Sequence, residues 1–154
     1  PSGCGKTALL RLLMGLETPD GGQMRIPKGT RFSAVFQEDR LLNRLTAAAN
    51  VRLAARVPAA QAEELLLALG IPLESLSLPV SAFSGGMRRR VTLCRALLAE
   101  YDVLTLDEPY KGLDEETRAR VMRLVEAHTA GRTVILVTHT LEEAGGYELI
   151  RLPV

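Results

Sequence analysis

Residues 1–7, PSGCGKT, combine small residues with a lysine and a hydroxyl side chain, the composition of a phosphate-binding loop. Small residues let backbone N–H groups curl around phosphate oxygens, and Lys6 adds a mobile positive charge. The Thr7 hydroxyl suits Mg²⁺, and a helix that begins here would point its positive end at the anion. The predicted phosphate contacts are Ser2, Gly3, Cys4, Gly5, Lys6 and Thr7. A glycine turn before an ordinary helix would give the same short pattern, so the neighbouring motifs must decide.

Two carboxylates, Asp107 and Glu108, directly follow an apolar run over residues 103–106 that predicts a buried strand. In open parallel α/β sheets, ligands bind at the carboxyl ends of the strands. Asp107 is therefore a candidate to hold Mg²⁺ through water, and Glu108 to polarise an attacking water as general base. The alternative is a strand that simply ends in polar residues, which is less common after a wholly apolar strand.

A second candidate anion site lies at Ser84, Gly85 and Gly86, which open another predicted helix. Ser84 can cap that helix, and its amino-terminal end would attract an anion. One chain with two phosphate-binding helix starts suggests two chains that share nucleotides. An ordinary loop with a capped helix is the alternative.

Gln37 and His139 each follow a predicted strand, over residues 31–36 and 133–137. Gln37 could reach Mg²⁺ or water, and His139 could sense a terminal phosphate or orient the attacking water. Each signal is weak alone, because a single histidine at a strand end is more often structural and a single glutamine carries almost no information.

The elements that must position these residues follow an α/β pattern. Uninterrupted apolar strands suit a parallel sheet covered on both faces, so the fold class is α/β, a mainly parallel sheet flanked by helices. Helices are predicted over 8–14, 84–98, 114–129 and 141–144, and strands over 23–26, 31–36, 103–106, 133–137 and 147–152.

The middle of the chain, residues 38–83, is instead rich in Ala, Leu, Arg and Glu. Pro58 can take the first position of a helix, and apolar residues follow it at helical spacing as far as Leu69. We therefore predict a small helical insertion at 38–83, inside a single α/β domain formed by residues 1–37 and 84–154.

Composition limits the function further. The 154 residues are 47% hydrophobic and 24% charged, with a net charge of +1. So balanced a charge argues against nucleic acid as a partner, and we interpret the one tight basic run, residues 88–90, as a solvated helix face.

The two cysteines, Cys4 and Cys94, form no disulfide framework or metal pair, which favours a reducing compartment. No stretch approaches the ~20 apolar residues that cross a bilayer, so any membrane association is expected through a partner.

Taken in order, these motifs resemble the ABC ATPase family across essentially the whole chain. Residues 1–7 resemble its P-loop, 36–42 its Q-loop, 84–86 its signature motif, 107–109 its Walker B motif, 112–114 its D-loop and 138–139 its switch histidine. Each motif is moderately specific, whereas six in order are very specific.

The resemblance implies a P-loop NTPase with a RecA-like core that hydrolyses ATP with Mg²⁺. In that family two cassettes, identical or homologous, sandwich two ATP molecules. The implied catalytic residues are Glu108, His139 and Gln37; the implied metal residues are Thr7, Gln37 and Asp107; and Ser84, Gly85, Gly86 and Asp114 join the P-loop as nucleotide contacts. The other implied partner is a transmembrane permease that docks on the helical insertion, so the chain would lie on the cytoplasmic face of the membrane.

The resemblance also favours a subfamily, the importers of nitrate, sulfonate and taurine. Two features support it: the tract 37–42, and Met87, which stands where most members of the family carry Gln.

The family's strand before the P-loop and that loop's first glycine are absent from this sequence. We therefore expect an amino-terminally truncated cassette that is poorly stable alone. Two alternatives stay open: a soluble ABC ATPase unrelated to transport, which the short interval from Thr7 to Ser84 argues against, and an inactive remnant, which the retained catalytic residues argue against.

Overall fold

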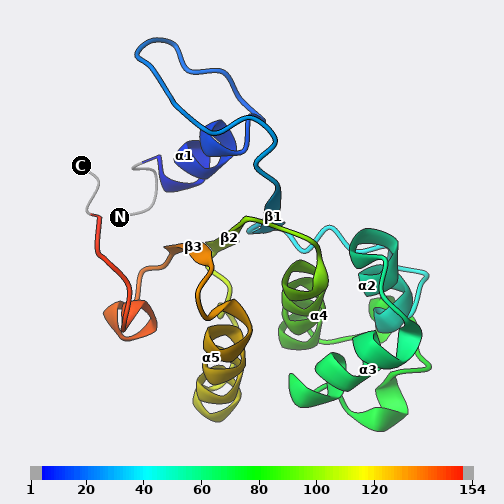
Figure 1. Cartoon of the computed structure of the whole chain (residues 1–154). Coiled ribbons are helices and arrows are strands. Elements are labelled where there is room, and N and C mark those ends of the chain that lie inside the picture. The colour runs from blue at the N-terminus through cyan, green and yellow to red at the C-terminus, as the bar shows by residue number, and fades with distance from the viewer. Residues whose placement is uncertain (1–4, 151–154) are drawn as a thin grey trace.

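The computed structural model describes residues 5–150 and shows a parallel sheet with helices on both faces (Figure 1). The strands are β1 (Phe32–Val35), β2 (Val103–Asp107) and β3 (Thr133–Val137). The α-helices are α1 (Lys6–Leu13), α2 (Ala47–Ala55), α3 (Ala59–Ala68), α4 (Gly85–Leu98) and α5 (Glu115–Thr129), and three 3₁₀ turns are η1 (Leu73–Ser75), η2 (Val80–Ala82) and η3 (Leu141–Ala144). The predicted α/β class is confirmed.

The sheet has the order β1-β2-β3, and both pairings are parallel. Val35 pairs with Leu106, and Leu106 pairs with Leu136, so the three strands end at one edge. In Figure 1, α1 lies on one side of the sheet while α4 and α5 lie on the other. The central strand is accordingly buried, with Leu104 and Leu106 at 0% exposure. This arrangement is the one that continuous apolar strands require.

Helix α4 is the core of the helical half of the molecule. It packs against α2 and α3 on one side and against β1 on the other. Its apolar residues Val91, Leu93 and Cys94 are fully buried, and burial raises the pKa of the Cys94 thiol to about 12. Residues 38–83 hold α2 and α3, while their division from the rest as a separate subdomain stays a prediction. Within residues 5–150, no helix is both long enough and apolar enough to cross a membrane.

Two predicted strands are wrong. Residues 23–26 carry no regular structure and belong to the long segment between α1 and β1 that projects from the molecule (Figure 1). Residues 148–150 are likewise irregular, and 151–152 lie outside the described residues. A strand needs a neighbour to accept its backbone hydrogen bonds, and the described residues offer neither segment one. Pro58 proves to be the N-cap of α3, so this helix begins at Ala59, one residue later than predicted.

The predicted helix caps are confirmed. The Ser84 hydroxyl accepts from the Met87 N–H at 3.2 Å, and an Asp114 carboxylate oxygen accepts from the Thr117 N–H at 2.9 Å. Each side chain satisfies one of the four N–H groups that a helix start leaves unpaired. These caps fix where α4 and α5 begin, and with them the loops next to the candidate site.

A buried amide, that of Asn50, helps to hold the chain between Gln37 and α2. Its Oδ1 accepts from the Leu42 N–H at 2.7 Å, and its Nδ2 donates to the Leu42 and Thr46 carbonyls at 3.1 and 3.0 Å. Asn50 is only 3% exposed, so water cannot replace these bonds without the loop opening. Asn50 thus ties this loop to α2, next to the isolated pairing of Thr46 with Pro79.

We expect Asn50→Ala to lower the free energy of unfolding by about 2 kcal/mol, because the Leu42 N–H loses its acceptor and the Leu42 and Thr46 carbonyls keep only their main-chain donors. Urea denaturation followed by circular dichroism measures this change. Arg52→Ala, on the exposed face of the same helix, is the control and should change the free energy by less than about 0.5 kcal/mol. Equal stabilities for the two variants would show that the loop does not need the amide.

Candidate functional site

The start of α1 meets the end of β2 through a direct hydrogen bond. The Thr7 hydroxyl donates to the Asp107 carboxylate at 2.7 Å, although the two residues are 100 positions apart. Gly5 precedes α1 with φ of 86°, a left-handed conformation that favours glycine. Lys6 is the first residue of the helix and is partly exposed at this end. The predicted contacts Ser2, Gly3 and Cys4 lie outside the described residues.

The Thr7–Asp107 pair suits Mg²⁺ by its chemistry. Both groups are oxygen ligands, the type that Mg²⁺ prefers, and Asp107 is 3% exposed, so little water competes for its carboxylate. Among residues 5–150, no group of three or more His, Cys, Asp and Glu side chains is arranged to hold a metal alone. Mg²⁺ usually takes one or two protein ligands and completes its shell with water and substrate phosphates, so the residues present fit the ion in that mode.

Glu108 lies immediately beyond the sheet and turns its side chain toward His139. Its Oε1 lies 2.7 Å from His139 Nε2, and its Oε2 lies 3.2 Å from Lys111 Nζ. Its N–H donates to the Val137 carbonyl at 2.9 Å, which extends the pairing of β2 with β3. The backbone of Glu108 is left-handed, with φ of 48°, and such a conformation in a non-glycine residue costs about 1–3 kcal/mol. The structure thus brings together two predicted catalytic residues and adds Lys111, which the sequence reading missed.

The pKa of Glu108 is lowered overall. Burial alone would raise it, but the hydrogen bond and charge of Lys111, together with His139, outweigh that effect. The carboxylate is therefore ionised near neutral pH, the form that can accept a proton from water.

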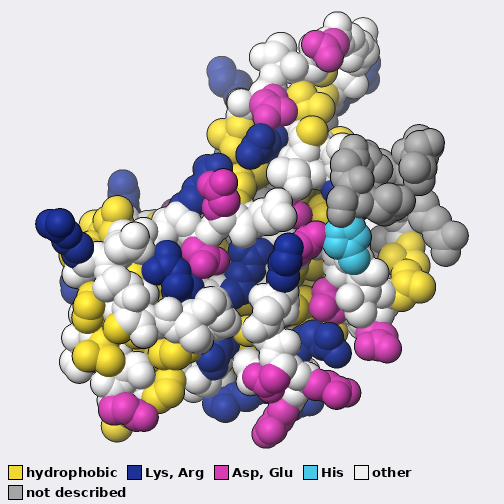
Figure 2. Space-filling view, turned by 180° about the vertical axis from the view of Figure 1, so that it is seen from behind, with side chains coloured by type: hydrophobic (Ala, Val, Ile, Leu, Met, Phe, Trp, Pro, Cys, Tyr) yellow, Lys and Arg dark blue, Asp and Glu magenta, His cyan; other side chains and the backbone are white. Residues whose placement is uncertain are grey.

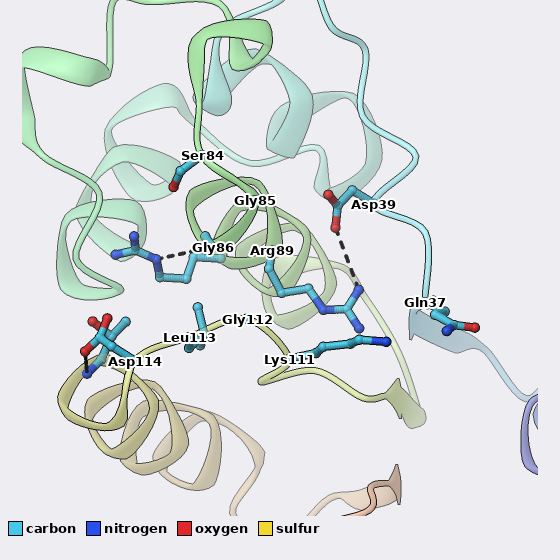
Figure 3. A pocket seen from close by; sticks show the side chains of 12 residues that line it. Gln37, Asp39, Ser84, Gly85, Gly86, Arg89, Lys111, Gly112, Leu113 and Asp114 are labelled. Carbon is cyan, nitrogen blue, oxygen red and sulfur yellow. Dashed lines mark hydrogen bonds and ion pairs between the residues drawn. The ribbon is translucent and has the colours of Figure 1, made fainter. Parts of the chain in front are cut away.

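A separate cavity of about 510 Å³ opens at the start of α4 (Figure 3). Of the predicted site residues, it is lined by Gln37, Ser84, Gly85, Gly86 and Asp114. Thr7, Asp107, Glu108 and His139 do not line it, so the predicted residues fall into two groups. Lys111 belongs to both, because it lines this cavity and pairs with Glu108.

Gly86 is required by a close approach of two backbones. A Cβ at this position would lie 3.3 Å from the Gly112 carbonyl oxygen and 3.3 Å from Leu113 Cδ2. The loop after β2 therefore packs directly on the first turn of α4, and a larger residue at 86 would push the two apart.

Gln37 is exposed just beyond β1, at the same edge of the sheet as Asp107. Because Val35 is level with Leu106, Gln37 follows at the level of Glu108. Its side chain lines the α4 cavity and makes no hydrogen bond to Thr7 or Asp107 among the described contacts. Its predicted role at the metal stays a prediction.

The basic run at 88–90 is not a solvated face, and that interpretation was wrong. The Arg89 side chain is 5% exposed and donates to the carbonyls of Phe36, Asp107 and Glu108. Arg88 donates to Asn43 Oδ1 at 3.0 Å, and Arg90 to the Gly70 carbonyl at 2.6 Å. Arg89 is thus buried, whereas Arg88 and Arg90 are half-buried and donate to neighbouring segments.

A signal for this burial is present in the sequence. Apolar residues fill most positions of 91–98 and leave no wide polar face. A helix that is apolar nearly all round is a buried one, and charged residues on its first turns must then find partners inside the protein.

Taken together, the parallel sheet and the Thr7–Asp107 contact at its carboxyl edge define the P-loop nucleoside-triphosphatase class. The chain belongs to the ABC transporter family, whose profile matches residues 1–111.

The relatives agree with this membership. The chain is 45% identical over 150 residues to the aliphatic sulfonates import ATP-binding protein SsuB 1 of Rhodococcus jostii, covering 94% of this chain and 61% of the relative. It is 40% identical over 160 residues to the taurine import ATP-binding protein TauB of Pseudomonas aeruginosa, covering 94% and 60%. The ATP-binding cassette MJ0796, solved as a dimer bound to ADP and Pi, superimposes with a TM-score of 0.82 at 27% identity, covering 94% of this chain and 74% of that one.

The chain thus spans about 60% of the length of the curated relatives that it matches. The fold and family follow from these comparisons, whereas the individual roles of the site residues remain proposals.

We expect Lys111→Met to raise the pKa of Glu108, because it removes the ammonium group that most strongly opposes the effect of burial. Carboxyl-carbon NMR titration of Glu108, assigned with Glu108→Gln, measures this pKa. Lys28→Met, at an exposed lysine in the turn before β1, is the control and should leave it unchanged. An unaltered Glu108 pKa in the Lys111 variant would rule out the ion pair in solution.

Proposed function

We propose that this chain binds and hydrolyses MgATP as the nucleotide-binding part of an ABC importer, for substrates of the sulfonate, taurine or nitrate type. The observation that carries the proposal is the cluster at the sheet edge, where the Thr7–Asp107 hydrogen bond lies next to the Glu108–His139 contact. A hydroxyl, a buried carboxylate and a carboxylate–histidine pair at one edge form the set that phosphoryl transfer to water requires.

The amino-terminal end of α1 would bind the β- and γ-phosphates of ATP. Backbone N–H groups of the loop point their positive ends at the anion, and Lys6 adds its ammonium group. The predicted contacts from Ser2, Gly3, Cys4 and Gly5 belong to the same loop. The main-chain donors position the phosphates, and the Lys6 charge compensates for their negative charge.

Thr7 and Asp107 would hold Mg²⁺, Asp107 through water, with Gln37 as a further ligand. The ion, when bound, neutralises charge on the phosphate oxygens. Before that, the Thr7 hydroxyl and the Asp107 carboxylate satisfy each other, at 2.7 Å, so the site is oriented in advance.

Glu108 would accept a proton from the attacking water, whose oxygen forms a bond to the γ-phosphorus as the bond to ADP breaks. His139, 2.7 Å from the Glu108 carboxylate, would orient that carboxylate and contact the γ-phosphate. The lowered pKa of Glu108 supports this role, because the base must be ionised before it can act.

A second cassette, identical or homologous, would complete each site. Ser84, Gly85, Gly86 and Asp114 surround their own cavity, apart from the catalytic cluster of the same chain. The two groups can lie apart in one chain if each binds a different nucleotide. In a head-to-tail pair of cassettes, the catalytic cluster of one chain would face the α4 cavity of the other. The dimeric form of the related MJ0796 cassette supports this reading.

A permease would provide the membrane contact, on the cytoplasmic face. Hydrophobic side chains gather over the end of the molecule that carries α2 and α3 (Figure 2). Leu53 is 63% exposed and Leu73 70% exposed at that end. Exposed apolar patches of this kind suit a protein partner, and the net charge of +1 argues against nucleic acid. The names of the relatives support sulfonate or taurine as the transported class.

We expect Glu108→Gln to lower ATP turnover by about 10²-fold or more, because it removes the general base. ATP affinity should stay within about threefold, since the phosphate contacts remain. Phosphate release and equilibrium binding of a fluorescent ATP analogue, on the protein as its source produces it, measure both. Glu74→Gln, at an exposed residue of η1, is the control. Turnover at the wild-type rate in the Glu108 variant would exclude Glu108 as the base.

We expect the Glu108→Gln protein to dimerise when ATP is added, because nucleotides that are not hydrolysed keep the two chains together. Adding Ser84→Arg should prevent this by filling the cavity at the start of α4, whereas adding Ser77→Arg, at an exposed turn residue, should not. Light scattering after size exclusion gives the mass. Equal dimerisation of both double variants would place the interface elsewhere.

A further inference from the structure

A buried guanidinium lies where three parts of the proposed site meet. Arg89 Nη1 donates to the Phe36 carbonyl, and Nη2 donates to the carbonyls of Asp107 and Glu108, the latter at 2.6 Å. Phe36 immediately precedes Gln37. Figure 3 shows the side chain reaching from α4 toward Asp39 and the Gln37 segment. One side chain therefore joins the segments on which Gln37 and Glu108 lie.

The strand ends explain why a cation is needed here. Because β1 and β2 are parallel and Val35 is level with Leu106, the carbonyls of Phe36 and Asp107 leave the sheet at the same edge. Both carbonyls accept from Arg89 rather than from a neighbouring strand, and the bond to the Asp107 carbonyl is buried. The planar fork of an arginine offers five N–H donors and can bond several carbonyls at once, which a lysine ammonium cannot do with the same geometry.

The backbone of Glu108 depends on its surroundings. Its φ of 48° is left-handed, and such a conformation persists only where neighbouring groups fix it. The Val137 carbonyl binds its N–H at 2.9 Å, and Arg89 binds its carbonyl at 2.6 Å. The two bonds together set the direction in which the Glu108 side chain leaves the main chain.

We propose that Arg89 is a positioning residue that holds the Gln37 segment and the Glu108 backbone in one fixed arrangement relative to α4. The proposal rests on the proposed function for its effect on catalysis. Since α4 begins at the cavity lined by Ser84 and Gly86, a shift of this helix reaches Glu108 through Arg89. Occupation of the cavity by a partner's nucleotide is thereby linked to the geometry of the general base in this chain.

Arg95 provides a matched control. It lies on the same helix and donates to the carbonyls of Arg40, at 2.9 Å, and Asp39, at 3.1 Å. It therefore holds the same loop beyond Gln37 but has no bond to Asp107 or Glu108. A merely structural role for Arg89 would make the two arginines equivalent in catalysis.

We expect Arg89→Met to lower kcat for ATP by about tenfold or more while the dissociation constant and KM for ATP stay within about threefold, because the base is displaced and the phosphate contacts are kept. Arg95→Met should lower the melting temperature but keep kcat within about twofold of wild type. Arg89→Lys retains the charge and should give an intermediate kcat. If Arg89→Met fails to fold, Arg89→Lys is compared with Arg95→Met instead. Equal kcat values for the Arg89 and Arg95 variants would overturn the proposal.

Hydrogen–deuterium exchange without nucleotide gives a second measurement that does not depend on hydrolysis. Arg89→Met should speed exchange of the amides in both 37–40 and 108–111, whereas Arg95→Met should do so only in the first segment. Unchanged protection of 108–111 in the Arg89 variant would also overturn the proposal. If the wild-type protein hydrolyses no ATP, the proposed function fails, and the exchange result alone still decides whether Arg89 holds both segments.

Discussion

Parallel pairing of β2 with β1 and β3 organises the whole molecule. It brings the ends of three strands to one edge, so Asp107, Glu108 and the residues after β1 and β3 become neighbours despite their distance in sequence. The same geometry leaves main-chain carbonyls at that edge without sheet partners. Arg89 satisfies them from α4, and the Glu108 N–H is satisfied by Val137. The same residues thus pair these main-chain groups and position the proposed base, Glu108.

Helix α4 connects otherwise separate features. Its first residues, with Ser84 as cap, border one cavity, and its next turn carries Arg89 to the end of the central strand. Its buried apolar residues fix it against α2, α3 and β1. Because well-packed interiors are not continuously deformable, a helix packed on so many sides moves as a rigid unit and displaces its neighbours when it shifts. This rigidity gives a physical basis for coupling between the two proposed nucleotide sites.

The two groups of site residues, one at the end of the sheet and one around the α4 cavity, differ in their chemistry. The proposed catalytic group has oxygen atoms that suit Mg²⁺ and an ionised carboxylate, and phosphates would complete the shell of a bound ion. The cavity group has a capped helix start and glycines, with Lys111 on its border. Lys111 pairs with Glu108 at 3.2 Å, so an anion that attracted this lysine into the cavity would also change the surroundings of the base. Membership in the ABC transporter family and likeness to a dimeric cassette agree with this division.

Local features of the chain could be predicted without its structure. The strands near 103–106 and 133–137, the caps Ser84 and Asp114 and the ordered motifs follow from residue type and spacing, so they could be predicted. Tertiary structure decided the rest: Arg89 is buried rather than solvated, Lys111 joins Glu108, and residues 23–26 form no strand. Each of these depends on partners distant in the sequence, which local periodicity does not encode. A charge is buried only if other segments bring carbonyls to it, and a strand exists only if another strand lies beside it.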